Sequence, residues 1–201
     1  MTKSKFKPPY WYHDNIKFSD YEIDILKNSL LEDQYKNQDV VDHKTTFNHH
    51  PNFRPDRFLN KYYKNIIDDI TKKVGIYHLS KYDYFFWSQL YEINGYHGPH
   101  NHTGEKGVDF NADISWVHFL DVPEQKCFRF TDTKGNILVP DEQSSGDIIC
   151  FPSWVWHEVV PLETDYLRLV TAGNIGFTSH DVLYSYDGPP LNSAGIKKHY
   201  T

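Results

Sequence analysis

The stretch GDIICFPSWVWH, residues 146–157, decides the fold. It opens with a Gly-Asp turn, continues through an apolar run, bends at Phe151-Pro152 and places His157 at the start of a further strand. Short apolar runs between turn residues are typical of β-strands. A histidine beside tryptophans is more often a packed core residue than a metal ligand. The role of His157 therefore depends on its neighbours.

The same pattern extends over the chain from Ile76 onward. Runs rich in Tyr, Phe, Trp, Val and Ile are separated by turns such as Asn94-Gly95 and Lys134-Gly135-Asn136. Candidate strands fall near residues 82–93, 113–120, 126–131, 136–139, 147–151, 155–160 and 166–173. These strands suffice for two packed sheets, so the sequence predicts a mainly β fold of the jelly-roll type.

Two amphipathic helices are predicted before this β half. Ser19 can cap the first helix and Glu22 can bond back to it, as in a capping box. The second runs from about Asp56 to Val74, where Gly75 is placed to end it. We expect a single domain over residues 1–201, with helical support in 1–75, the jelly-roll core in 76–177 and an irregular extension in 178–201.

Composition excludes several classes of protein. Hydrophobic residues make up 39% of the chain, charged residues 24% and aromatic residues 16%, which is a globular balance with a ring-rich core. The net charge of −6 and the dispersed basic residues disfavour nucleic-acid binding. No apolar run has the length of a signal peptide or membrane span, so we expect a soluble, cytoplasmic protein. Cys127 and Cys150 lie in apolar runs and are expected to be buried free thiols.

A cluster of histidines, HGPHNH at residues 97–102, is the first sign of chemistry. Residues two apart in an extended strand point to the same face, so His100 and His102 can face one ion while Asn101 points away. Imidazole suits Fe, Zn, Cu and Ni, so the spacing does not name the metal. A pair of surface or hydrogen-bonding histidines is an equally common interpretation of His-x-His.

Arg168 is the second sign, because it interrupts the apolar run YLRLVTA at residues 166–172. An arginine in such a strand is costly unless it meets an anion, and a guanidinium binds a carboxylate through two parallel hydrogen bonds. The alternative partner is an acidic side chain of the protein itself, such as Asp113 or Glu92.

The ordered set of these features resembles the core of the 2-oxoglutarate/Fe(II) oxygenase superfamily. It comprises His100-x-His102, the run DISWVHFL at 113–120, the stretch 146–157 and Arg168 through Ile175. The set is most similar to a branch of small bacterial and phage proteins in which His-x-His replaces His-x-Asp, and it covers roughly residues 90–176. The resemblance implies a double-stranded β-helix fold, Fe(II) held by His100, His102 and His157, and 2-oxoglutarate anchored by Arg168.

Two positions depart from the family pattern. The usual hydroxyl two residues after the arginine is replaced by Val170, so Tyr91, Ser115 or Thr171 would supply the second contact to 2-oxoglutarate.

The second departure is the missing carboxylate ligand of the usual two-histidine, one-carboxylate site. Either His102 takes its place, in which case Zn(II) would also be tolerated, or Asp109 or Asp113 reaches the metal. We favour three histidines, because the same-face geometry needs no loop rearrangement.

Other aromatic and imidazole side chains are lesser candidates. His97 can orient a ligand or touch substrate, and His118 is expected to pack in a strand or line the pocket wall. Four tryptophans are candidates for the core, and those near His157 could also keep water from the metal: Trp87, Trp116, Trp154 and Trp156.

The resemblance implies an enzyme that couples decarboxylation of 2-oxoglutarate, with O2, to hydroxylation of an organic substrate that the sequence does not name. The alternatives are a cupin-like metalloenzyme that does not use 2-oxoglutarate, and a non-catalytic jelly-roll binding or structural module.

Overall fold

The computed structural model describes residues 8–36, 43–74, 76–77, 82–103, 112–177 and 183–184. Its elements in chain order are β1 (Trp11–Asn15), α1 (Asp20–Leu30), η1 (Asp33–Tyr35), β2 (Lys44–Thr45), η2 (Pro51–Phe53), η3 (Pro55–Leu59), α2 (Asn60–Lys73), β3 (Ile76–Tyr77), β4 (Tyr82–Tyr91), β5 (His97–His100), β6 (Ile114–Asp121), β7 (Phe128–Thr131), β8 (Ile137–Leu138), β9 (Asp147–Pro152), β10 (His157–Val159), β11 (Arg168–Phe177) and β12 (Leu183–Tyr184).

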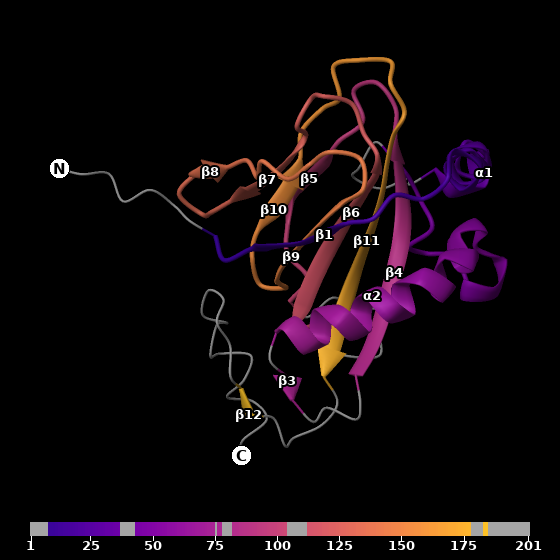
Figure 1. Cartoon of the computed structure of the whole chain (residues 1–201). Helices are drawn as coiled ribbons and strands as arrows, with labels where there is room; N and C mark the ends of the chain where they lie inside the picture. Colours follow the sequence, from indigo (N-terminus) through magenta and orange to yellow (C-terminus); the bar gives the residue numbers. More distant parts are fainter. Residues whose placement is uncertain are drawn as a thin grey trace.

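Two antiparallel sheets form the body of the molecule. A six-stranded sheet has the order β1-β9-β6-β11-β4-β2, and a four-stranded sheet has the order β5-β10-β7-β8. Figure 1 shows the strands of the smaller sheet on one side of the larger sheet and the two α-helices toward its other side. The predicted mainly β jelly roll is thus confirmed.

Successive side chains of a strand point to opposite faces, so a separate apolar core packs on each face of the larger sheet. On β6, Trp116 and Leu120 belong to the core shared with the helices, whereas Val117 and Phe119 belong to the core between the two sheets. Strands buried on both faces read as nearly continuous apolar runs, which is why the sequence pattern of this region is so strong.

All seven predicted strands are present with small shifts of their ends, and β11 continues to Phe177. The two-residue strands β2 and β3 carry too little sequence for an alternating pattern and were not predicted, and neither were β1 and β5. Within the extension predicted to be irregular, Leu183–Tyr184 pairs with Ile76–Tyr77, so that prediction is corrected for these two residues. The rest of residues 178–201 lies outside the described part of the chain.

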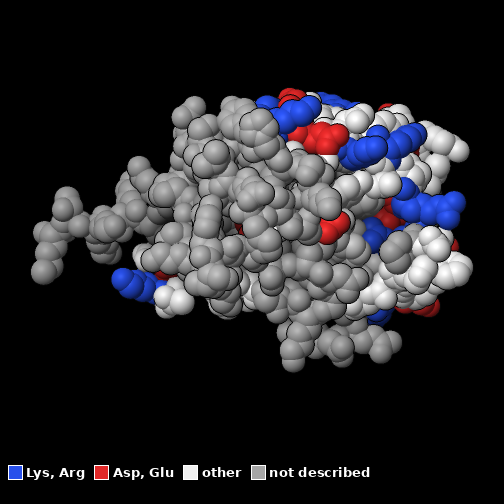
Figure 2. All heavy atoms as spheres, turned by 90° about the horizontal axis from the view of Figure 1, so that it is seen from below, with Lys and Arg blue, Asp and Glu red and all other residues white. Residues whose placement is uncertain are grey.

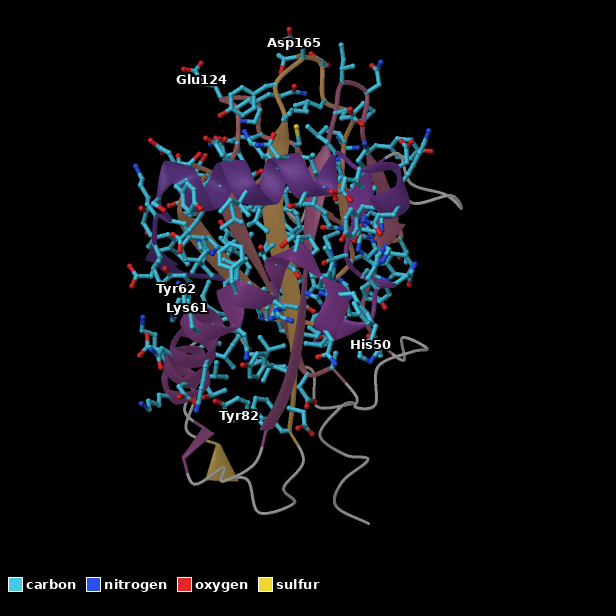
Figure 3. The ribbon with its side chains drawn as sticks, turned by 90° about the vertical axis from the view of Figure 1, so that its right-hand side faces the viewer. His50, Lys61, Tyr62, Tyr82, Glu124 and Asp165 are labelled. Atoms are coloured by element: carbon cyan, nitrogen blue, oxygen red, sulfur yellow. The ribbon has the colours of Figure 1, made fainter. Side chains whose placement is uncertain are left out.

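The helices begin close to where the sequence predicts. The capping box at Ser19 is present, with Glu22 N–H donating to the Ser19 hydroxyl and the Glu22 carboxylate accepting from Ser19 N–H. The second predicted helix divides at Asn60, because residues 55–59 form a 3-10 helix before α2. Gly75, its predicted end, is not among the described residues. In Figure 3, Lys61 and Tyr62 mark α2, and Tyr82 lies toward the end of the sheet opposite Glu124 and Asp165.

Three features of the described chain bear on the predictions made from the composition. No helix in the described part of the chain combines the length and apolar character needed to cross a bilayer. Both basic and acidic side chains appear on the described part of the face in Figure 2. Cys127 and Cys150 are buried free thiols, as predicted.

Gly173 holds the position where β11 crosses the large Trp116 ring. A Cβ at residue 173 would lie 2.4 Å from Trp116 Cζ2 and 2.8 Å from the Phe85 carbonyl oxygen, so the strand has no room for a methyl group. We expect Gly173→Ala to lower the free energy of unfolding by about 1–3 kcal/mol through overpacking. Urea denaturation measures this.

The matched control is Gly98→Ala, because a Cβ there meets nothing within 4 Å. Its free energy of unfolding is expected to stay within about 0.5 kcal/mol of the parent. Equal stability of the two variants would show that Trp116 adapts to the added methyl group.

Candidate metal and co-substrate site

Three imidazoles meet where β5 ends and β10 begins. His100 and His157 are register partners in the smaller sheet, and His102 is fixed just beyond β5 by its backbone N–H, which donates to the Ser153 carbonyl at 2.8 Å. The potential ligand atoms of these three residues lie within 4.8 Å of one another. The fold therefore brings together the three histidines that the sequence singles out.

Backbone carbonyls orient two of the three rings. His100 Nδ1 lies 2.8 Å from the Gly98 oxygen, and His157 Nδ1 lies 3.0 Å from the Val155 oxygen. A carbonyl only accepts, so each Nδ1 carries a hydrogen and each Nε2 keeps a lone pair for a metal. Burial, reinforced by His100 and His102, lowers the pKa of His157 well below its ordinary value. The neutral form that coordinates metals is therefore favoured at neutral pH.

Arg168, the first residue of β11, is buried in the space between the sheets. Its side chain lies over the Tyr91 ring at 4.9 Å and near the Phe119 ring at 5.8 Å, and the residue is 1% exposed. Neither Nη1 nor Nη2 has a hydrogen-bond partner among the described residues, and no described acid, Asp113 and Glu92 included, forms an ion pair with it. A buried cation in this state calls for an anion other than those of the described residues.

A single cavity connects the imidazoles with Arg168. Its volume is about 30 Å³, which is on the scale of bound water, so the lining side chains must move to admit a larger ligand. The described side chains that line it include no Asp or Glu. The charged side chain among the described lining residues is therefore the Arg168 guanidinium.

Three solved structures have a similar fold. A prolyl-4-hydroxylase from Pseudomonas putida has a TM-score of 0.58 at 15% identity, over 86% of this chain and 95% of that one. HygX from Streptomyces hygroscopicus, with nickel and 2-oxoglutarate bound, has a TM-score of 0.56 at 12% identity, over 85% and 83%. SnoN, a non-haem α-ketoglutarate-dependent epimerase from nogalamycin biosynthesis, has a TM-score of 0.59 at 14% identity, over 89% and 81%.

The chain has the fold of the 2-oxoglutarate/Fe(II) oxygenases. This confirms, at the level of the fold, the family resemblance and the double-stranded β-helix that it implies. Neither a scan against protein-family models nor a search of curated proteins gave a match. Because a hydroxylase and an epimerase share the oxygenase fold, the fold alone does not fix the reaction.

Within this oxygenase fold, the three candidates for a second co-substrate contact lie in different places. Tyr91 is the register partner of Arg168, and its buried hydroxyl has no hydrogen-bond partner among the described residues. Ser115 lines the cavity, but its hydroxyl lies 2.8 Å from Asn174 Oδ1 and 3.0 Å from Ser153 Oγ. Thr171 is not a cavity residue: its hydroxyl lies 3.1 Å from Ser88 Oγ on the sheet face that the helices cover.

Asp113, one of the two candidate carboxylates, is not part of the group of potential metal ligands found among the described residues. Asp113 accepts a hydrogen bond from the Phe177 backbone N–H at 2.9 Å. Asp109 falls outside the described residues. The group of potential metal ligands that the described chain brings together consists of histidines alone.

His118 and the tryptophans divide between core and cavity. His118 lies outside the cavity, with Nδ1 3.0 Å from the Tyr63 hydroxyl and Nε2 2.7 Å from the Ile16 oxygen. Trp87 and Trp116 line the cavity, and the Trp87 ring lies 5.6 Å from that of His102. Trp154 is half-buried and Trp156 is exposed.

Two residues beside the site were not singled out by the sequence: His43, which belongs to a column of rings, and Gln89, which contacts it. His97 stacks on His100 with centroids 3.8 Å apart, and His43 lies between His97 at 5.0 Å and Tyr91 at 4.8 Å. Gln89 Nε2 lies 3.1 Å from His43 Nε2 and lines the cavity. Gln89 shares a strand face with Tyr91, a signal that could have found it, whereas His43 comes from a polar segment without any pattern.

Proposed function

We propose that this chain is a metal-dependent oxygenase in which His100, His102 and His157 hold Fe(II) and Arg168 anchors 2-oxoglutarate. The observation that carries the proposal is the buried Arg168 guanidinium, which lines the same cavity as the three imidazoles and has no anionic partner among the described residues. An enzyme that binds a dicarboxylate beside a metal needs both a cation for the carboxylate and a group of metal ligands.

The three imidazole nitrogens are suitable ligands for iron. Three neutral imidazoles are common ligands for Fe, and they also tolerate Zn(II). Iron, when bound, would supply the activation of O2 that is coupled to oxidative decarboxylation of the co-substrate. Because no described carboxylate offsets the metal charge, this centre would attract an anionic co-substrate more strongly than a site with two histidines and one carboxylate.

Tyr91 is the second co-substrate contact that we favour. Its hydroxyl is buried beside Arg168 without a hydrogen-bond partner, and leaving a buried hydroxyl unpaired costs about 1–3 kcal/mol. A carboxylate that accepts from both Arg168 and Tyr91 would satisfy them together. Tyr91 would thus replace the hydroxyl that the family carries at the position of Val170.

Apolar walls complete the site. Phe128, Phe151 and Val159 line the cavity from the smaller sheet and β9, and Trp87 lines it from β4. These side chains would keep bulk water from the reacting atoms and strengthen the contacts of Arg168 with an anion. The reaction class we infer is hydroxylation of an organic substrate, whose identity depends on variable loops.

We expect the iron-loaded protein to release succinate slowly from 2-oxoglutarate even without its prime substrate. This leak should require both Fe(II) and O2, because the decarboxylation is oxidative. Measuring succinate with and without each component checks the result, and His157→Ala serves as the inactive control.

Two negative results would each favour an alternative function. If calorimetry on manganese-loaded protein detects no binding of 2-oxoglutarate, the cupin-like metalloenzyme becomes the better description. Purified protein that takes up no metal at all would favour the non-catalytic jelly-roll module.

A further inference from the structure

We propose that Asn174 is a positioning residue that sets the tautomer of His102, and that its side-chain amide reverses when the metal binds. The inference rests on the metal centre proposed above and not on 2-oxoglutarate. It concerns the one ligand of the three whose Nδ1 faces an amide side chain, with Asn174 Nδ2 at 3.3 Å, rather than a backbone carbonyl.

A buried polar chain surrounds His102. Asn174 Oδ1 lies 2.8 Å from Ser115 Oγ, and Ser115 Oγ lies 3.0 Å from Ser153 Oγ. Asn174 is 0% exposed, and Ser115 and Ser153 are fully buried as well. Groups held in this way away from water keep their hydrogen bonds satisfied, so the direction of each bond follows from that of the next.

In the metal-free protein, the direction of each hydrogen bond in this chain follows from the tautomer of His157. Its Nδ1 hydrogen is committed to the Val155 oxygen, so its Nε2 can only accept. His102 Nε2 lies 3.3 Å from His157 Nε2 and must be the donor in that contact. His102 Nδ1 is then an acceptor, which takes a hydrogen from Asn174 Nδ2, and Asn174 Oδ1 accepts from the Ser115 hydroxyl.

Metal binding requires the opposite arrangement at His102. Its Nε2 needs a free lone pair, so the ring proton moves to Nδ1, and Nδ1 then needs an acceptor. A half-turn of the Asn174 amide supplies Oδ1 as that acceptor and directs Nδ2 toward Ser115 Oγ. Ser115 in turn donates to Ser153. One proton changes place on the His102 ring, and none is gained or lost.

Asparagine suits this position because one side chain offers both a donor and an acceptor. The carbonyls that face His100 and His157 permit a single tautomer each. The free-energy cost of changing tautomer therefore arises at His102, which is the ligand at the position where related oxygenases carry a carboxylate. Metal affinity then depends on how well residue 174 accepts a hydrogen bond.

Nitrogen-15 NMR of the imidazoles tests the proposal, with Zn(II) as a diamagnetic probe. We expect His102 to carry its hydrogen on Nε2 in metal-free protein and on Nδ1 after Zn(II) is added. Asn174→Leu, which can neither accept nor donate, should weaken Zn(II) binding roughly 10- to 100-fold. Asn174→Asp accepts only, so His102 should carry Nδ1–H before and after metal addition.

Ser88→Ala is the matched control, because it removes a buried hydroxyl from the same sheet on the face away from the metal. Its Zn(II) affinity should equal that of the parent. An Nδ1–H tautomer of His102 in metal-free parent protein, or parental Zn(II) affinity in Asn174→Leu, overturns this inference alone. Parent protein that binds no Zn(II) overturns the metal centre as well. If Asn174→Leu does not fold, the parent spectra and Asn174→Asp still decide.

Discussion

His157→Ala is expected to abolish stoichiometric Fe(II) binding while the protein remains folded. The substitution removes one of three ligands, so the loss of affinity should exceed the roughly 10- to 100-fold typical of a residue that only orients a ligand. The fold should persist because two extensive apolar cores, one on each face of the larger sheet, do not depend on the metal. His100→Ala and His102→Ala should behave alike. Metal analysis and circular dichroism on the same samples measure both properties.

His118→Ala is the control with the opposite outcome. This imidazole is buried and bonded to Tyr63 and Ile16, but it lies outside the cavity. Its removal should lower thermal stability and leave iron binding intact. If His102→Ala retained stoichiometric iron and full turnover, the three-histidine centre would be wrong, and Asp109 or Asp113 would become the better ligand.

Arg168→Lys is expected to weaken binding of 2-oxoglutarate about ten- to a hundred-fold. Lysine keeps the charge but lacks the planar fork, so a two-point contact with a carboxylate should lose about 1.5–3 kcal/mol. Metal affinity should be nearly unchanged, because the imidazoles are untouched. Calorimetry with manganese-loaded protein gives both affinities.

Arg54→Lys provides a matched comparison, since Arg54 is also buried but already holds Asp56 through contacts of 2.9 and 2.8 Å. That variant should lose thermal stability and keep its affinity for 2-oxoglutarate. If Arg168→Lys behaved in the same way, with lower stability and unchanged affinity, Arg168 would be a structural residue and not part of the active site.

The strands could be predicted because both faces of the larger sheet are buried, which leaves long apolar runs such as residues 113–120. The imidazole cluster could be predicted from the His-x-His spacing together with the corner that leads to His157. Asn174 and His43 could not, since contacts such as Asn174 with His102 join residues far apart in the chain and arise from packing.

The position of Thr171 relative to Arg168 follows from the alternation of side chains along a strand. Residues three apart on a strand point to opposite faces, so Thr171 faces away from the side on which Arg168 lies. The hydroxyl group made Thr171 a candidate, but the parity of the strand directs it away from the cavity. Tyr91 comes from a different strand, and only the register of β4 with β11 places it beside Arg168.

The most direct measurement is a crystal structure of the protein soaked with Mn(II) and 2-oxoglutarate. We predict manganese bound by Nε2 of His100, His102 and His157, with the far carboxylate of 2-oxoglutarate in contact with the Arg168 guanidinium and the Tyr91 hydroxyl. Manganese held by a carboxylate in place of His102 would contradict the proposed ligand set. A 2-oxoglutarate molecule bound away from Arg168, or an empty cavity at saturating concentration, would contradict the proposed function.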